Sequence, residues 1–425
     1  MKKILTVLMV LTMVLSISIA KGQEEDTIEI IWLTSEGAVI NEDATKPEMI
    51  VRDFLIENPE VTVKRLQIDL SDGSTMHMDA LIAAGMAPDV YNDFLGRAGK
   101  YMNPDFALDL SKYHTDLDDY LPGTLDAFRN NGALLGLPQP GGYQGMCINL
   151  DLANELGLDI PVDVTIEQFL NAAGKVKSGK DATWITGMFA ANQSGDYLIM
   201  NWFASFGAVM YEPGYSASAV NSVEGLKTIE FWKKLYDKGY IQKESAVLSD
   251  DDYALYWARG QYLATAFYPS WCPIYFKVVK EQGLGEGFDY KFTRFPRAPG
   301  VKKVPTAGSF PGLVVKASDN EERNKLSARL AWHINNAKFQ EMQVLFDKGY
   351  TNRKSVTAKL DDPYWNQIDA IFQENGYFDL GLALPCFSEI RAQMYPQLQQ
   401  LFTGKKTPAE VLADYEKNVN EILNQ

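Results

Sequence analysis

Cysteine and histidine are scarce in this sequence, with three of each among 425 residues. The cysteines, Cys147, Cys272 and Cys386, are widely spaced and odd in number, which fits neither a disulfide framework nor a zinc site and leaves room for at most one bridge. No Gly-x-Ser-x-Gly turn, His-Glu-x-x-His helix or Cys-x-x-Cys pair occurs. We therefore expect neither acyl-transfer nor zinc chemistry, and no metal or cofactor.

A basic excess is also absent. The 55 Asp and Glu residues outnumber the 40 Lys and Arg residues, giving a net charge of −15. Such acidity argues against nucleic acids and anionic membrane surfaces as partners. The run GKVKSGK at 174–180 resembles a phosphate-binding loop, but Asp181 replaces the required Ser or Thr and would repel phosphate.

Long apolar runs are confined to the N-terminus. A basic start, MKK, precedes an apolar run over residues 4–15 and the small-residue end SIA at 18–20. This pattern predicts a signal peptide over residues 1–20, cleaved near Ala20, because the apolar run is shorter than the roughly 20 residues that span a bilayer. No Cys follows the leader to carry a lipid anchor. We expect an exported, periplasmic protein without membrane insertion after cleavage.

The length predicts two or three domains, because single cores stop growing near 250–300 residues. The first part alternates between strand and helix patterns, at 28–33, 47–57, 61–68, 74–84 and 88–91. Such a β-α-β-α-β run forms a parallel sheet, with a ligand crevice at the carboxyl ends of its strands. The breaker cluster GLPQPGG at 136–142 indicates a boundary, and the later half is richer in helices, expected at 150–156, 166–177, 223–238 and from Thr407 onward.

Polar and aromatic side chains fall at the predicted crevice positions. Aromatic faces stack on sugar rings, while carboxylates, guanidinium groups and amides bind hydroxyls. The candidates are Trp32 with Ser35 and Glu36, Asp93 with Arg97, Tyr143, Asn201 with Trp202, and the segment YPSW at 268–271. A Trp or Tyr is nevertheless more often a core residue than a ligand platform.

Several segments together carry a resemblance to a known family. They are FLIENP at 54–59 leading into VTV at 61–63, LIAAGMAPDV at 81–90, GLP at 136–138 with INLD at 148–151, LDIP at 158–161 with TIEQF at 165–169, and GQYLATA at 260–266 with YPSW at 268–271. In these segments the chain resembles the family 1 extracellular solute-binding proteins, the maltodextrin-binding-like receptors of ABC sugar importers. Ile166 stands where that family usually has Trp.

The resemblance implies a fold and its division. The fold class is α/β, a two-lobed periplasmic-binding-protein type II fold in which each lobe is a central sheet flanked by helices. Hinge crossings are expected near 136–146, 262–268 and 306–314. The N-lobe would comprise residues 24–137 and 268–308, and the C-lobe residues 145–262 and 314–425. Ligand binding between the lobes would stabilise a closed state over an open one.

The resemblance also implies a ligand-binding set. Carried over by position, it consists of Ser35, Glu36, Asp93, Arg97, Tyr143, Asn192, Asn201, Trp202, Tyr268, Trp271, Ser309, Phe310 and Arg391. Trp271 matches the family's Trp after the second crossing. Arg391 stands near a position that is aromatic in maltodextrin binders, which leaves room for a more polar or acidic sugar.

The function implied is non-enzymatic. We expect a monomeric receptor that captures a mono- or oligosaccharide and delivers it to the transmembrane subunits of an ABC permease. Two alternatives stay open: a receptor for another polar solute, and a secreted glycoside-active enzyme, which needs two carboxylates across the scissile bond. Arg97 and Arg391 favour a neutral or anionic ligand over a cationic one.

Overall fold

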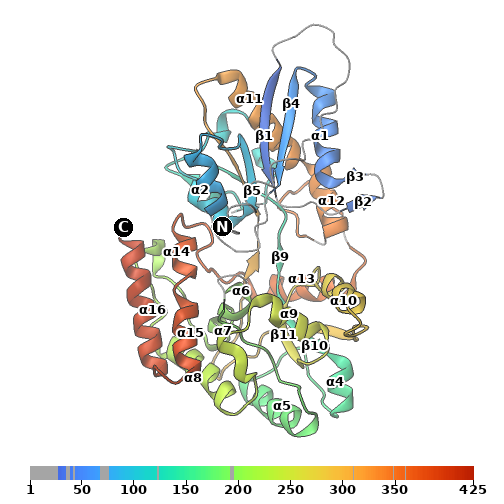
Figure 1. The fold of residues 1–425 in the computed structure, drawn as a ribbon, viewed down its shortest axis with the longest axis vertical. Coiled ribbons are helices and arrows are strands. Elements are labelled where there is room, and N and C mark those ends of the chain that lie inside the picture. The colour runs from blue at the N-terminus through green and yellow to red at the C-terminus, as the bar shows by residue number, and fades with distance from the viewer. Residues whose placement is uncertain are drawn as a thin grey trace, which may run out of the picture.

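The computed structural model describes residues 27–34, 39–41, 44–67, 76–121, 124–191, 196–309, 311–347, 349–358 and 360–425. The predicted leader lies outside these residues. Two lobes stack along the long axis of the molecule and are joined at a narrower middle (Figure 1). We call this middle the waist; its connecting segments are residues 139–144, 306–309 and 349–358.

The N-lobe is built on a five-stranded sheet of order β4-β1-β5-β14-β8. Strand β1 runs parallel to β4 and β5, whereas β14 runs antiparallel to β5 and β8. The strands are β1 (Ile28–Thr34), β4 (Val61–Gln67), β5 (Val90–Phe94), β8 (Leu137–Pro138) and β14 (Pro311–Val315). Its helices are α1 (Lys46–Glu57), α2 (Met76–Ala83), α3 (Leu95–Ala98), α11 (Glu321–Ile334) and α12 (Ala337–Asp347).

The C-lobe is mainly helical around a three-stranded antiparallel sheet of order β11-β10-β12. These strands are β10 (Gly145–Asn149), β11 (Ala264–Phe267) and β12 (Tyr290–Thr293). Its helices are α4 (Leu150–Glu155), α5 (Ile166–Gly179), α6 (Asp196–Met200), α7 (Trp202–Phe206), α8 (Val223–Asp237), α9 (Asp250–Ala258), α10 (Cys272–Glu281), α13 (Pro363–Asn375), α14 (Phe387–Arg391), α15 (Met394–Phe402) and α16 (Pro408–Leu423).

Short pairs complete the described strands. At the waist, β9 (Gly142–Tyr143) pairs with β13 (Gly308–Ser309), so the first two connecting segments run side by side. The others are β2 (Val39–Asn41) with β3 (Ala44–Thr45) and β6 (Arg129–Asn130) with β7 (Ala133–Leu134). A third connection joins them where Gly141 and Tyr350 exchange backbone hydrogen bonds.

The strand pairing corrects the expected division of the chain. Residues 268–308 were expected in the N-lobe, yet β12 pairs with β10 in the C-lobe sheet. Residues 314–425 were expected in the C-lobe, and α13 to α16 do lie there, but β14 pairs with β5 and α11 contacts the same N-lobe sheet. The physical reason is that residues 262–268 do not cross: β11 stays beside β10, and α10 then packs on α9. The segments that connect the lobes are residues 139–144, 306–309 and 349–358.

The helix ends follow the local sequence signals. Thr165 and Thr407 each accept a hydrogen bond from the third helical residue, whose side chain bonds back, so α5 and α16 begin with complete capping boxes. The apolar stripe of α16 buries Val411, Leu412 and Tyr415, and the helix packs against α8 and α15. This stripe is a core face of the C-lobe.

One buried histidine makes the stability of the N-lobe depend on pH. His114 is 7% exposed, and burial, opposed in part by Asp116, lowers its pKa from 6.5 to about 4. The unfolded chain therefore takes up a proton as the pH falls below about 6.5, whereas the folded chain does not until about pH 4. Between about pH 7.5 and pH 5 this difference lowers the free energy of unfolding by roughly 2 kcal/mol.

The measurement is urea unfolding followed by circular dichroism across this pH range. The variant His114→Gln, which cannot ionise, should lose that part of the pH dependence. His333, whose pKa is also lowered by burial, keeps its own contribution in both proteins. Equal slopes of stability against pH in the variant and the parent would contradict the assignment to His114.

Candidate functional site

The carboxyl ends of the N-lobe strands face the waist. Strand β14 enters the sheet directly after the second connecting segment, and its first residue, Pro311, pairs with Phe94 at the end of β5. Strand β1 runs parallel to β5 and ends at Thr34, which pairs with Asn92. The last residues of β1 and β5 therefore lie on the side of the N-lobe that faces the C-lobe, the strand-end position where ligands bind in open α/β sheets.

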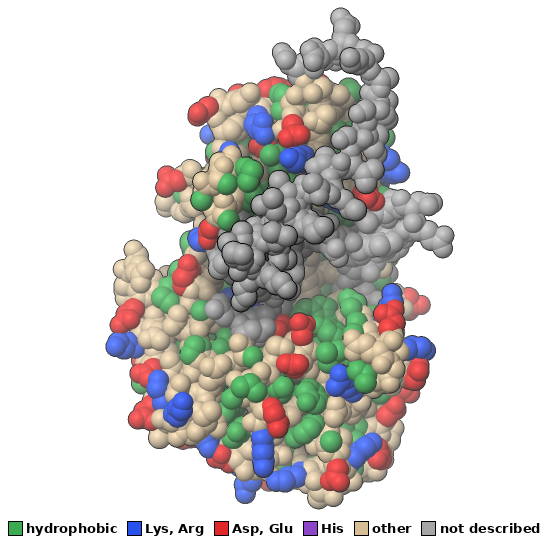
Figure 2. All heavy atoms as spheres, in the orientation of Figure 1, with side chains coloured by type: hydrophobic (Ala, Val, Ile, Leu, Met, Phe, Trp, Pro, Cys, Tyr) green, Lys and Arg blue, Asp and Glu red, His purple; other side chains and the backbone are tan. Residues whose placement is uncertain are grey.

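The C-lobe presents the end of β11 and the start of α10 to the same region. Gly145 begins β10 directly after the waist and pairs with Phe267, the last residue of β11. Tyr268 and Trp271 follow, and Trp271 is the residue before the first turn of α10. In this region the space-filling view shows hydrophobic side chains gathered just below the waist, over α9 and α10 (Figure 2).

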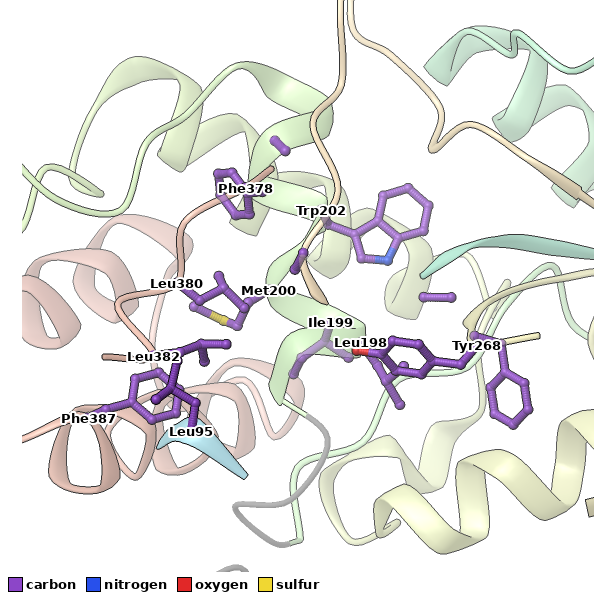
Figure 3. Close-up of a cluster of buried hydrophobic side chains, with 14 of the residues drawn as sticks. Leu95, Leu198, Ile199, Met200, Trp202, Tyr268, Phe378, Leu380, Leu382 and Phe387 are labelled. Carbon is purple, nitrogen blue, oxygen red and sulfur yellow. The ribbon is translucent and has the colours of Figure 1, made fainter. Parts of the chain in front are cut away.

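Trp271 is half-buried and belongs to an aromatic group at this edge. Its ring lies 4.9 Å from Tyr268, 5.6 Å from Phe267 and 6.4 Å from Tyr275, measured between centroids. Tyr268 is buried and points toward Leu198 and Ile199 of α6 (Figure 3). Tyr268 thus supports Trp271 from behind, while the partly exposed indole is the member able to offer a face to a ligand.

Tyr143 lies on the first connecting segment and joins a second aromatic group. Its ring stacks on Phe372 of α13 at 3.5 Å and meets Tyr350 edge-on at 4.8 Å; Tyr350 in turn stacks on Trp365 at 4.6 Å. Burial raises the pKa of Tyr143, so its phenol is a neutral hydrogen-bonding group at neutral pH. The two groups meet at Gly142, whose α-carbon faces the Tyr268 ring so closely that an added Cβ would lie 3.3 Å from it.

The sequence-based candidates missed Tyr350, Trp365 and Phe372. All three belong to the third connection and α13, which the expected domain division placed wholly within the C-lobe. The available signal was the density of aromatic residues between 350 and 372, but only the fold brings them to Tyr143.

Asp93 and Arg97 lie at the end of β5 and bind each other. The Arg97 guanidinium donates two hydrogen bonds of 2.6 Å to the two carboxylate oxygens of Asp93. Asp93 also accepts hydrogen bonds from the Tyr91 hydroxyl and the Phe94 amide. A buried carboxylate with these partners is a structural anchor that fixes the loop after β5.

Arg391 is buried beneath the waist, and this corrects its expected role. Its guanidinium lies 5.5 Å from the centre of the Phe94 ring and 5.6 Å from that of Phe387, and its side chain is 4% exposed. Such stacking on aromatic faces stabilises contact between α14 and the loop after β5. Figure 3 shows Phe387 of α14 beside Leu95 of α3, where the same contact continues. Arg391 therefore joins the lobes rather than facing the crevice.

The structure also corrects the expectation for Trp202. Its side chain is 2% exposed and packs against Phe169, Phe231 and Phe295 in the C-lobe core. Its neighbour Asn201 is fully buried and accepts a hydrogen bond from the Ala307 amide, so it holds the second connecting segment. Asn201 therefore supports the waist from within the C-lobe, whereas Trp202 is a core residue of that lobe.

The remaining candidates lie outside the described residues. These are Ser35, Glu36, Asn192 and Phe310, together with the side chain of Ser309, whose backbone forms β13 opposite Gly142. Within the part of the chain that the structure describes, no group of His, Cys, Asp and Glu side chains has the arrangement of a metal site. Its three cysteines are free thiols: Cys147 and Cys272 are buried, and Cys386 is partly buried.

The family is established by comparison with known sequences. A family model for bacterial extracellular solute-binding proteins matches residues 49–371, which is most of the chain. The chain therefore belongs to the bacterial extracellular solute-binding proteins, and the expected family resemblance is confirmed. No curated protein matches the chain by sequence. None of the helices in the described ranges has both the length and the apolar character to cross a membrane.

Solved structures confirm the two-lobed fold. An ABC substrate-binding protein from Listeria monocytogenes in complex with cycloalternan is 18% identical, with a TM-score of 0.75 over 94% of this chain and 100% of that one. A chitin oligosaccharide binding protein is 18% identical, with a TM-score of 0.77 over 94% and 100%. The maltose-bound MalE3 of T. maritima is 15% identical, with a TM-score of 0.74 over 93% and 100%.

Proposed function

We propose that this protein is an exported receptor of an ABC importer that captures a mono- or oligosaccharide between its lobes and delivers it to the permease, without chemistry of its own. The observation that carries the proposal is Trp271, a half-buried indole at the end of β11, supported by Tyr268 on the crevice side of the C-lobe. An indole face held in this way suits the apolar face of a sugar ring. Similar structures named for cycloalternan, chitin oligosaccharide and maltose support the same ligand class.

The described charges favour a neutral sugar. Arg97 and Arg391 were the two cations that left room for an anionic ligand, but Arg97 is bound by Asp93 and Arg391 is buried against Phe94 and Phe387. Both guanidinium groups are therefore engaged within the protein, which favours a neutral ligand. Asp93 is likewise held in its ion pair, so it is a poor candidate for one of the two acids that glycoside hydrolysis requires.

The proposed capture step is closure about the waist. Three connecting segments lie together there, joined by the β9–β13 pair and by the backbone bonds between Gly141 and Tyr350. A ligand that contacts both lobes stabilises the closed arrangement by the difference in its contacts between the two states.

A sugar panel tests the function directly. Maltose, chitin oligosaccharides, cycloalternan and tagatose are titrated while thermal unfolding, tryptophan fluorescence and small-angle scattering are recorded. We expect one sugar to raise the melting temperature by a few degrees, since a ligand at 100 times its Kd adds about 2.7 kcal/mol, and to reduce the radius of gyration. The bound sugar should be recovered unchanged. Stabilisation by a non-carbohydrate solute alone, or cleavage of the sugar, would overturn the proposal.

A further inference from the structure

A cavity lies in the C-lobe, and its lining residues differ from the aromatic groups at the waist. Its volume is about 720 Å³, within the range of about 300–1,000 Å³ typical of small-molecule sites. Its walls come from the loop 207–215 after α7, from residues 303–305 and from residues 377–379. Tyr143, Tyr268 and Trp271 do not line it. Figure 3 shows Phe378, from its wall, and Tyr268, from the crevice, on separate sides of the α6–α7 segment.

Three tyrosines give this cavity the character of a carbohydrate site. Tyr211, Tyr215 and Tyr377 all line it, and the rings of Tyr211 and Tyr215 meet edge-on at 5.4 Å. Tyr377 is 40% exposed as a residue, while burial raises the pKa of its phenol, so this tyrosine lies at the boundary between the cavity and solvent. Aromatic faces of this kind accept the apolar face of a sugar ring, and the phenols add hydrogen-bonding groups at their edges.

The backbone around the cavity is arranged to hold these rings in place. Tyr215 has a φ of 57° and follows Gly214 with a φ of 70°, a left-handed conformation that costs a non-glycine residue free energy. In this conformation the Tyr215 hydroxyl donates a 2.7 Å hydrogen bond to Asp379. Gly381, with a φ of 75°, allows the Tyr211 ring to approach to a distance at which a Cβ would lie 2.8 Å from it. Strained positions of this kind cluster at binding sites.

The charged groups around the cavity indicate the class of ligand. Glu212, Asp379 and Lys303 line it, so the cavity offers two carboxylates that accept hydrogen bonds and one ammonium group that donates them. Its lining has no cluster of cationic side chains that would favour an anionic ligand. We propose that this cavity is a second binding site, specific for a neutral cyclic saccharide unit that stacks on the tyrosines and bonds to Asp379, Glu212 and Lys303. The site is separate from the crevice proposed above.

The position of the cavity couples it to the waist. Residues 303–305 lead directly into the second connecting segment, and Thr306 exchanges backbone hydrogen bonds with Gly376 and Phe378 next to the cavity wall. A ligand in the cavity would therefore contact the chain that must move when the lobes close. It would shift the population of open and closed states if it binds one of them better.

Fluorine NMR of the full chain labelled with 3-fluorotyrosine tests the site. The resonances of Tyr211, Tyr215 and Tyr377 are assigned by Phe substitution at each position. Maltose and glucose are the probes, and mannitol, which has hydroxyls but no ring face, is the control. We expect saturable shifts of these resonances with a ring sugar and none with mannitol. The variant Tyr377→Ala should weaken the sugar-dependent shift of Tyr211 about tenfold in apparent Kd.

Two further variants separate this site from the crevice. Trp271→Ala should leave the tyrosine shifts intact, even if it abolishes binding at the waist. Tyr113→Ala removes a tyrosine from the N-lobe surface and should change nothing. No shift with either sugar, an equal shift with mannitol, or a shift that disappears in Trp271→Ala would overturn the second site. None of these outcomes decides whether the crevice binds sugar, which the fluorescence of Trp271 reports separately.

Discussion

Replacing Arg353 with alanine is expected to lower the free energy of unfolding by about 3–5 kcal/mol, because it leaves two carboxylates without their buried partner. The Arg353 side chain is 1% exposed and contacts Asp116 at 2.5 Å and Asp119 at 3.2 Å. Its Nε donates to the Asn335 carbonyl at 2.8 Å, and the guanidinium lies 4.4 Å from the centre of the Tyr120 ring. One side chain thus connects the third connecting segment to the N-lobe. Denaturant unfolding followed by circular dichroism measures the effect.

Two substitutions serve as controls for Arg353. Arg353→Lys keeps the charge but loses the planar fork, so it should fall between the parent and Arg353→Ala. Arg52→Ala removes an exposed arginine that is paired with Asp53, and should change stability by less than about 1 kcal/mol. Similar losses in Arg353→Ala and Arg52→Ala would show that the buried network does not stabilise the lobe as argued.

Local elements could be predicted from the sequence where a periodic pattern and an end signal agree. The helix expected over 166–177 is α5, and that expected from Thr407 onward is α16, and each begins with a complete capping box. The alternating start of the chain predicted β1, β4 and β5, whose parallel pairing is confirmed. In these cases residues close in the sequence determine whether a helix or a strand forms, and tertiary contacts then stabilise it.

The assignment of segments to lobes could not be predicted in the same way. Strands β11 and β14 are short and buried, and their sequences do not say which sheet they join. The partner is decided by packing across long sequence separations, such as Phe94 with Pro311 and Gly145 with Phe267. Because a crossing was expected at 262–268 and none at 349–358, residues 268–308 and the stretch from β14 to α12 were assigned to the wrong lobes, whereas α13 to α16 belong to the C-lobe as expected.

The sequence alone does not separate candidate site residues from buried structural ones. Tyr143 lies in β9 at the waist and Trp271 follows β11 at the start of α10, so both stay candidates for ligand contact. Trp202 and Arg391 follow no such strand end, and the structure buries them. Residue type does not distinguish an aromatic residue that binds a ligand from one in the core, since both roles require a large apolar ring. Solvent exposure distinguishes them, and exposure depends on the whole fold.

Replacing Trp271 with alanine is expected to weaken binding of the sugar identified by the panel by about a hundredfold, or roughly 3 kcal/mol. The expectation follows from its position: the indole is half-buried at the crevice edge of the C-lobe, backed by Phe267 and Tyr268, so its ring is held in place before a ligand arrives. A preorganised aromatic platform loses little entropy on binding, and its removal costs the stacking contact without compensation. Isothermal titration calorimetry measures the change.

Two variants determine whether that loss is specific to Trp271. Trp271→Phe keeps a smaller aromatic face and should bind the sugar more tightly than Trp271→Ala. If the indole only filled space, Trp271→Leu would restore the affinity as well as Trp271→Phe does. Trp332→Ala removes an indole from the N-lobe surface, where it donates a hydrogen bond to Asp116, and should leave sugar affinity unchanged. If Trp271→Ala binds as tightly as the parent while its melting temperature in the absence of sugar is unchanged, the ligand stacks elsewhere, and the aromatic group around Tyr143 and Phe372 becomes the platform to test.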